Sequence, residues 1–129
     1  MIVSESGLAV SNKQIISDAY DAMASGDIKT FLAVLDERIE VREPTTLPYG
    51  GHYRGIGELM GMFAKAGPVL DSSRLTVATL TAEEDRVVAL LRIPLRSGAG
   101  EAEISEHWQL EDGKAVKLDV YWHDTSIVS

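Results

Sequence analysis

The stretch of residues 101–122 reads EAEISEHWQLEDGKAVKLDVYW. Apolar and polar residues alternate along both of its halves, and Asp112-Gly113 separates them. Alternation with a period of two is typical of a β-strand with one buried face, and an Asp-Gly pair favours a turn between two strands. The stretch therefore predicts an antiparallel β-hairpin whose inner face belongs to a hydrophobic core.

The register of this hairpin can be predicted from its two apolar rows, which are Ala102, Ile104, Trp108 and Leu110 in the first strand and Val116, Leu118, Val120 and Trp122 in the second. A two-residue loop would place apolar residues opposite polar ones. A three-residue loop, with Gly113 as a left-handed bulge residue, pairs position 110 with 114 and makes the rows coincide. We therefore expect Trp108 opposite Val116, Glu106 opposite Leu118, and apolar neighbours around Glu106.

Two acidic residues interrupt the predicted apolar rows. Glu106 lies in the middle of its row, and Glu43 continues the row of Ile39 and Val41 at the end of an earlier strand. A carboxyl group facing an apolar interior loses hydration, which raises its pKa above the roughly 4.3 of free Glu, and a second acid nearby raises it further. Both residues are therefore candidates for general acid–base chemistry.

Structural explanations compete with this catalytic one. Glu43 stands at a strand end, where alternation often stops indicating burial. A salt bridge to Arg92 would account for Glu106, and the strand that carries Arg92 is apolar on both faces, which leaves the direction of its side chain open. Asp124, at the end of the last row, is more typical of a turn or a cap than of a catalyst.

The N-terminal half favours helices, which places the chain in the α+β class. We expect a loose arm over residues 1–10, followed by one domain over 11–129. A capping box at Ser11 and Gln14 predicts the start of a first helix, and Asp27 predicts the cap of a second. After an irregular segment at 45–55, a third helix is closed by Gly67-Pro68. Strands are expected at about 74–81, 86–96, 101–111 and 114–123.

Composition restricts the partners and cofactors. The net charge of −8 disfavours nucleic acid, and no segment is long and apolar enough to cross a membrane. The absence of cysteine removes thiolate chemistry and fits a cytoplasmic location. The three histidines lack metal-binding spacing, and no glycine-rich phosphate loop follows a strand. We therefore expect neither a metal nor a cofactor.

Several short motifs, in their order and spacing, resemble the ketosteroid isomerase-like superfamily, which includes SnoaL-like polyketide cyclases and nuclear transport factor two. They span nearly the whole chain, and they are Ala24-Ser25-Gly26-Asp27, Val41-Arg42-Glu43-Pro44, Gly50-Gly51-His52-Tyr53-Arg54-Gly55, Leu110-Glu111-Asp112-Gly113-Lys114 and Tyr121-Trp122. The resemblance implies a cone, in which a strongly curved antiparallel sheet wraps around N-terminal helices and encloses an interior pocket. It also implies a homodimer formed through the sheet.

The resemblance further implies roles for single residues. Glu43, directly before a proline, matches the general base of the isomerases, and Glu106 matches the acid that holds the oxyanion. Trp122 matches a tryptophan of the pocket. The oxyanion tyrosine of the isomerases falls on Ala19 here, with Tyr20 as its neighbour, and this departure counts against steroid isomerisation.

The resulting hypothesis is a cofactor-independent enzyme that acts on a small, mostly apolar carbonyl compound. Glu43 would remove a proton from carbon, and protonated Glu106 would stabilise the enolate. The side chains expected to shape the cavity are Tyr20, Tyr49, Tyr53, Met60, Phe63, Arg92, Trp108 and Trp122. One alternative is an epoxide-hydrolase-like hydrolase, in which an inward-facing Arg92 bridges carboxylates. The other is a non-catalytic module that binds a small molecule or dimerises.

Overall fold

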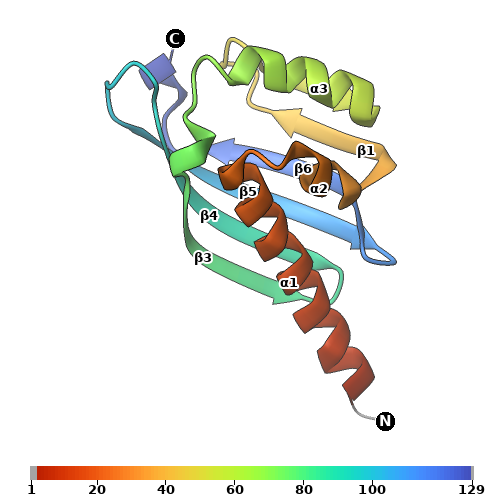
Figure 1. The fold of residues 1–129 in the computed structure, drawn as a ribbon. Helices are drawn as coiled ribbons and strands as arrows, with labels where there is room; N and C mark the ends of the chain where they lie inside the picture. The colour runs from red at the N-terminus through yellow and green to blue at the C-terminus, as the bar shows by residue number, and fades with distance from the viewer. Residues whose placement is uncertain (1–2, 129) are drawn as a thin grey trace.

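The computed structural model describes residues 3–128, with side chains described from residue 12 onward. The described residues form three helices, all in the N-terminal half, and six strands, the last four of which are consecutive (Figure 1). These elements follow the predicted α+β order. In chain order they are α1 (Val3–Ser25), α2 (Ile28–Ala33), β1 (Leu35–Glu43), β2 (Gly51–Arg54), α3 (Gly55–Ala66), β3 (Thr76–Glu83), β4 (Arg86–Pro94), β5 (Glu101–Glu111) and β6 (Lys114–Trp122), with short 3₁₀ turns at Ser72–Arg74 and Thr125–Val128. None of the described helices is both long and apolar enough to span a membrane.

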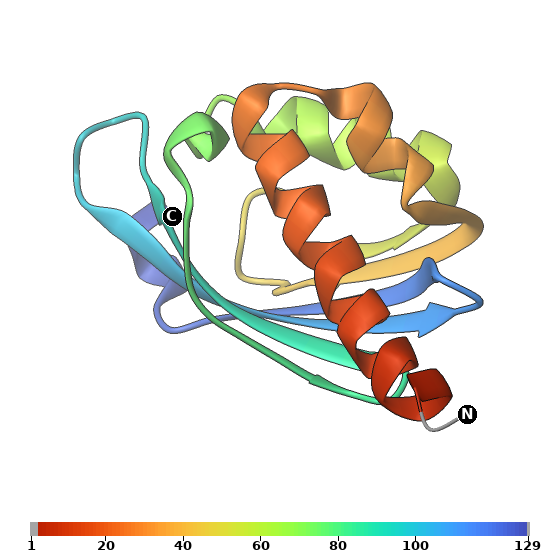
Figure 2. The same cartoon turned by 60° about the horizontal axis from the view of Figure 1, so that its bottom comes forward.

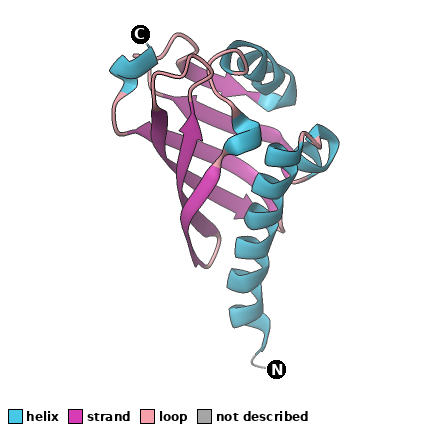
Figure 3. Ribbon diagram, turned by 60° about the vertical axis from the view of Figure 1, so that its left-hand side comes forward, coloured by secondary structure: helices cyan, strands magenta, loops and turns pink. Residues whose placement is uncertain are grey.

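The strands form one curved, unclosed sheet in the order β2-β1-β6-β5-β4-β3. All of its pairs are antiparallel except β1 with β6, which run parallel, so the expected all-antiparallel sheet is wrong at this one pair. The helices cover the concave face, with α1 packed across β3 and β4 and α3 over β1 and β2 (Figures 2 and 3). The predicted cone-like arrangement is confirmed.

The turn between β5 and β6 has two residues, not the expected three. Asp112 and Gly113 both have positive φ, at 50° and 77°, which is the geometry of a tight type I′ turn. Glu111 consequently pairs with Lys114.

A β-bulge on β6, with Val116 as the extra residue, then brings the two apolar rows together. Trp108 lies opposite Leu118 and Glu106 lies opposite Val120, each two residues further along β6 than expected. The predicted register is therefore wrong, but the faces are right from Leu118 onward, because a difference of two residues leaves a side chain on the same face. Val116 was predicted to lie in the inner row, and Ala115 takes that buried position instead. We expected the length of the loop to bring the two apolar rows opposite each other, whereas in the structure the bulge on β6 does so.

The first helix starts earlier than its capping-box pattern predicted. Backbone over residues 3–10 is helical and continuous with the rest of α1, so the expected loose arm is wrong for these residues, while residues 1–2 lie outside the described part. The first turns project beyond the edge of the sheet (Figures 1 and 3). No proline lies between residue 3 and Ser11, and the single glycine, Gly7, costs only about 1 kcal/mol within a helix. A capping motif has no effect where a helix has already begun.

The helix boundaries near the centre follow the predicted signals. Asp27 is the N-cap of α2, and its carboxylate accepts a hydrogen bond from the amide of Thr30 at 3.2 Å. α3 ends next to Gly67, as expected. The two helices contact each other through Phe31 and Phe63, whose ring centroids are 5.7 Å apart in an edge-to-face arrangement. These contacts hold α2 and α3 together above the sheet.

A short strand lies within the segment 45–55 that was expected to be irregular. β2 pairs with the end of β1, so that Glu43 lies opposite Gly51. Its four residues follow a loop with two prolines and a glycine pair, and so brief a strand has no periodicity to detect. The loop before it contains two tight turns, with hydrogen bonds from the Leu47 amide to the Pro44 carbonyl and from the Gly50 amide to the Leu47 carbonyl.

Replacing Gly50 with alanine should destabilise the fold by at least about 2 kcal/mol. A β-carbon at this position would collide with the backbone carbonyl of Pro44 and lie 2.8 Å from the α-carbon of Thr45. Gly57→Ala in α3 is the matched control, because nothing lies within 4 Å of its added carbon, and alanine favours a helix by about 1 kcal/mol. Urea unfolding of both variants checks the prediction, and equal stabilities would contradict it.

Candidate functional site

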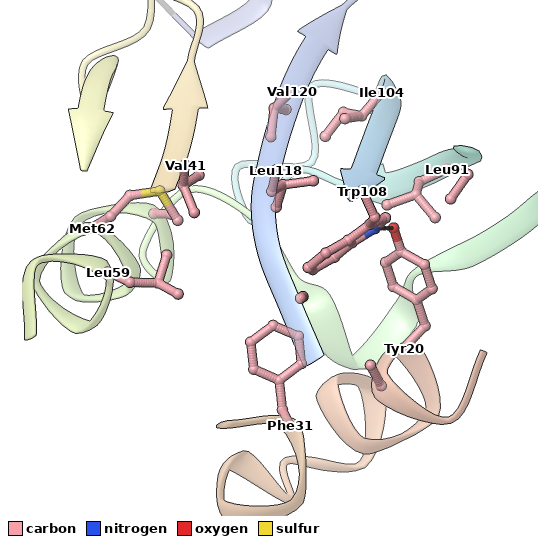
Figure 4. Close-up of a cluster of buried hydrophobic side chains, with 14 of the residues drawn as sticks. Tyr20, Phe31, Val41, Leu59, Met62, Leu91, Ile104, Trp108, Leu118 and Val120 are labelled. Carbon is pink, nitrogen blue, oxygen red and sulfur yellow. Dashed lines mark hydrogen bonds between the residues drawn. The ribbon is translucent and has the colours of Figure 1, made fainter. Parts of the chain in front are cut away.

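An interior cavity of about 290 Å³ lies between the concave face of the sheet and the helices. Its wall is mostly apolar, and it receives residues from all three helices and from β1, β4, β5 and β6. Figure 4 shows part of this wall, where Phe31 of α2 and Leu59 and Met62 of α3 point toward the apolar row of the sheet. A space of this size and lining is typical of a site for a small organic molecule.

Glu43 and Glu106 both line the cavity. Val120 lies opposite Glu106, and Glu43 is the next residue after Arg42, which pairs with Asp119. The two acids therefore flank Val120 from the strands on either side of it, which places their α-carbons about 10 Å apart. Their side chains leave the same concave face of the sheet.

Two hydrogen bonds connect Glu106 to the first helix. The hydroxyl of Tyr20 donates to Oε1 of Glu106 at 2.7 Å, and Nε1 of Trp108 donates to the Tyr20 hydroxyl at 2.7 Å (Figure 4 shows the second bond). An indole N–H can only donate, so the Tyr20 oxygen accepts, and its single proton is left for Glu106. Tyr20 thus reaches the interior, although Ala19 occupies the position of the isomerase tyrosine.

Both carboxyl groups ionise less readily than a free Glu side chain, as the apolar rows predicted. Burial raises the pKa of Glu106 to about 7, although the hydrogen bond from Tyr20 acts in the opposite direction by stabilising the carboxylate. Burial raises the pKa of Glu43 to about 8, and the charge of Glu106 adds to this effect. The hydrogen bond from Tyr20 favours the charged form of Glu106, whereas Oε1 of Glu43 receives no hydrogen bond from the described residues, so Glu106 ionises more readily than Glu43.

Three of the residues that line the cavity carry a buried polar atom without a hydrogen-bond partner among the described residues. These buried atoms are Oε1 of Glu43, the hydroxyl oxygen of Tyr49 and Nε1 of Trp122. The rings of Tyr49 and Trp122 touch edge to face, with centroids 6.5 Å apart. A buried polar group without a partner costs about 1–3 kcal/mol, so its persistence in a folded protein needs an explanation such as a bound molecule.

Six of the eight residues expected to shape the cavity do line it, namely Tyr20, Tyr49, Met60, Phe63, Trp108 and Trp122. Tyr53 does not. Its hydroxyl donates to the main-chain carbonyl of Tyr49 at 2.7 Å, so it positions the loop that carries Tyr49. Sequence reasoning placed Tyr53 in the cavity because the segment 45–55 was read as a loop, whereas β2 gives this residue a fixed direction.

Arg92 also lies outside the cavity, on the opposite face of the sheet. Its guanidinium Nε is 4.0 Å from carboxylate oxygens of Glu101 and Glu103, and the side chain is half exposed. The expected contact with substrate and the salt bridge to Glu106 are therefore wrong. The hydrolase alternative required an inward Arg92, and this condition is not met. The neighbours of Arg92 in the strand are apolar on both sides, so only the sheet could settle its direction.

One charged residue of the cavity wall was missed. Arg96 lines the cavity, and its Nε donates to the main-chain carbonyl of Gly67 at 2.6 Å. It follows the end of β4, in a turn where alternation no longer indicates a face. No sequence signal could have placed it, because its contact with the end of α3 joins segments 29 residues apart.

The remaining polar candidates lie away from the cavity. Asp124 accepts a hydrogen bond from the amide of Ser126 at 2.9 Å, which is a turn contact, as predicted. The histidines His52, His107 and His123 are exposed, and His52 lies 3.1 Å from a carboxylate oxygen of Glu40. Within residues 12–128, no three His, Asp or Glu side chains are grouped so that they could hold a metal ion.

Comparison with known proteins agrees with this fold. A family model described as a SnoaL-like domain matches residues 16–118. Among curated proteins, no match was found. One similar solved structure is Bal32a from a soil-derived mobile gene cassette, with 18% sequence identity and a TM-score of 0.81 over 92% of this chain and 94% of that one. A second is an NTF2-like protein of Burkholderia thailandensis, with 25% identity and a TM-score of 0.79 over 91% of this chain and 93% of that one. A third is a putative ketosteroid isomerase of Kribbella flavida, with 16% identity and a TM-score of 0.76 over 90% of this chain and 80% of that one.

The free energy of unfolding should fall as the pH rises from about 4.5 to about 8, because the folded chain holds protons on Glu43 and Glu106 that the unfolded chain has released. Each carboxyl group contributes at most about 1.4 kcal/mol per pH unit to this slope. The double variant Glu43→Gln/Glu106→Gln should flatten the slope in urea unfolding. The exposed control Glu103→Gln should keep it, and an unchanged slope in the double variant would refute the assignment.

Proposed function

Because the chain belongs to the SnoaL-like family, we propose that it is a cofactor-independent enzyme that moves a proton at a carbon atom next to a carbonyl group. The substrate would be a small, mostly apolar compound. One observation carries the proposal, namely two carboxyl groups, those of Glu43 and Glu106, that belong to the wall of the same apolar cavity without an ion pair among the described residues. Isomerases and cyclases within this family and fold use chemistry of this kind.

The electrostatics of the cavity suit proton transfer. A general base works best when its pKa is close to the ambient pH, since it then both accepts and releases a proton readily. Burial brings Glu106 and Glu43 into that range, and no Lys or Arg forms an ion pair with either carboxyl among the described residues. An ion pair with a cation would have lowered both pKa values and removed this property.

The shape of the cavity supports the proposed substrate class. Its walls are apolar along most of their length, with polar atoms confined to a few positions, which are the side chains Tyr20, Glu43, Tyr49, Glu106, Trp108, Trp122, Ser72 and Arg96. An apolar compound with one or two oxygen atoms would satisfy both kinds of surface.

Binding without turnover is the second candidate, and the unpartnered atoms of Glu43, Tyr49 and Trp122 favour it equally. A module of this kind would use the same cavity for recognition alone. It would bind small carbonyl compounds and release them unchanged.

A homodimer formed through the outer face of the sheet remains a proposal. Leu90 and Tyr121, with exposed fractions of 45% and 53%, lie on either side of Ser105 on the outer face of the sheet. Apolar patches on an outer sheet face are typical of contact surfaces. We likewise keep the cytoplasmic location and the exclusion of nucleic acid and membranes as proposals.

The variant Leu90→Glu/Tyr121→Glu should reduce the mass of the protein in solution from dimer to monomer, because it places like charges face to face across a two-fold contact. Sedimentation velocity measures this mass. Ile127→Glu is the matched control, since Ile127 is also exposed, at 37%, but lies after the sheet. A monomeric unmodified chain would refute the proposal.

The enzyme should exchange protons for deuterium at the carbon next to the carbonyl in a panel of small apolar ketones, as measured by NMR in D₂O. The rate should be highest between about pH 7 and 8, where one carboxyl is ionised and the other is protonated. In Glu43→Gln/Glu106→Gln it should fall at least about 100-fold, because no general base remains.

Glu103→Gln, on the outer face, is the control for this experiment and should exchange at the unmodified rate. Full activity in the double variant would exclude the two carboxyls as the catalysts. Measurable binding of the ketones without any exchange would instead favour the non-catalytic module.

A further inference from the structure

We infer that Tyr49, Trp122 and protonated Glu43 hold the oxygen atom of the substrate, and that Glu106 is the base that removes the proton. This inference rests on the proposed function and assigns the parts of its mechanism. It reverses the roles that the family resemblance implied, in which Glu43 is the base and Glu106 holds the oxyanion.

The first argument is the set of free donors. Nε1 of Trp122 can only donate, and the hydroxyl of Tyr49 carries one proton, yet neither buried atom has a partner among the described residues. Their rings touch edge to face, so the two residues adjoin in the cavity wall. An acceptor oxygen placed there would satisfy both donors at once. A carbonyl oxygen is an acceptor without a proton and therefore fits this requirement.

The second argument is that the hydrogen-bond donors next to Glu106 already have acceptors within the protein. The indole proton of Trp108 goes to the Tyr20 hydroxyl, and the Tyr20 proton goes to Glu106. Neither proton remains for a substrate oxygen. The hydrogen bond that Glu106 receives stabilises its charged form, which is the form a base needs.

The third argument is the environment of Glu43. Its Oε1 is buried and receives no hydrogen bond from the described residues, so nothing compensates a charge there. An ionised Glu106 two strands away disfavours a second negative charge further, and these effects together raise the pKa of Glu43 to about 8. Glu43 is therefore neutral when Glu106 is ionised. A neutral carboxyl group has a proton to donate, which makes it a third donor beside Tyr49 and Trp122.

The positions along the sheet agree with this division. Glu106 pairs with Val120, and Trp122 lies two residues further along the same strand, which corresponds to about 7 Å. A substrate whose acidic carbon lies over Glu106 can thus extend its carbonyl group toward Trp122. Tyr49 borders Trp122 on that side.

The reaction step balances with these groups alone. The Glu106 carboxylate takes the proton from carbon, and the electron pair of the broken C–H bond forms a carbon–carbon double bond. The carbonyl π electrons move onto oxygen, which becomes an enolate oxygen with hydrogen bonds from Tyr49, Trp122 and Glu43. Return of the proton from Glu106 to the same carbon, or to a conjugated one, restores the carbonyl group. The donors contribute most when the oxygen carries its full charge.

Two single variants separate the two assignments. Glutamine keeps a neutral donor at position 43, so Glu43→Gln should retain deuterium exchange to within about 10-fold of the unmodified rate. Glu106→Gln removes the base, so its rate of deuterium exchange should fall at least about 100-fold. The opposite ranking, with Glu43→Gln inactive and Glu106→Gln active, would overturn the inference.

A binding measurement tests the oxygen site without turnover. Phenolates mimic an enolate oxygen. The variant Glu106→Gln imitates the uncharged Glu106 that exists after proton transfer, so it serves as the background for this measurement. Tryptophan fluorescence measures the affinity for phenolate. Adding Tyr49→Phe or Trp122→Phe should weaken binding about 10-fold or more, because each removes a donor to a charged oxygen. Tyr121→Phe, on the outer face, should leave it unchanged.

The outcomes distinguish failure of this inference from failure of the proposed function. Phenolate binding that depends on Tyr20 but not on Tyr49 or Trp122 would overturn the oxygen site. If no ketone exchanges but phenolate binding still requires Tyr49 and Trp122, the oxygen site stands and the proposed enzyme does not. Thermal unfolding of each variant confirms that the fold is intact, and Tyr49→Phe removes only a hydroxyl without a partner.

Discussion

The hydrogen bond from Tyr20 to Glu106 is the interaction on which the site depends. It joins the first helix to the centre of the sheet across 86 positions of sequence. The indole N–H of Trp108 can only donate, so the Tyr20 oxygen accepts from it and the Tyr20 proton goes to Glu106. Because a hydroxyl has a single proton, this bond also determines that Glu106 is an acceptor. The cavity therefore has two different ends. The Glu106 carboxyl accepts a hydrogen bond at one end, and Tyr49 and Trp122 at the other end have donors without partners among the described residues.

This arrangement lowers the stability of the folded chain. Two acids in an apolar cavity and three polar atoms without partners among the described residues are each unfavourable, and the surrounding packing must offset them. The bulge at Val116 and the tight turn at Asp112-Gly113 contribute by matching the apolar rows of β5 and β6. Fully buried residues such as Ile16, Val87 and Leu110 supply the packing away from the cavity. A site held open in this way is prepared for a ligand before the ligand arrives.

Much of the cavity could be predicted from periodicity, but not the parts that depend on direction. Alternation identified Glu106 and Glu43, since an acid in an apolar row is visible in the sequence itself. It could not place Arg92, whose strand is apolar on both faces, or Tyr53, whose short strand has no detectable period. Arg96 follows a strand end, where no pattern applies, and reaches the cavity only through the fold.

The amino-acid sequence by itself determined the α+β class, the inner rows of the final hairpin and the two acids within apolar rows. These features are local, because side-chain direction along a strand follows from position alone. Only the tertiary structure decided that Tyr20 reaches Glu106, that the hairpin matches its rows by a bulge, and that Tyr49 and Trp122 leave free donors. These depend on which distant segments touch. The acids were thus visible in advance, whereas the direction of every hydrogen bond around them was not.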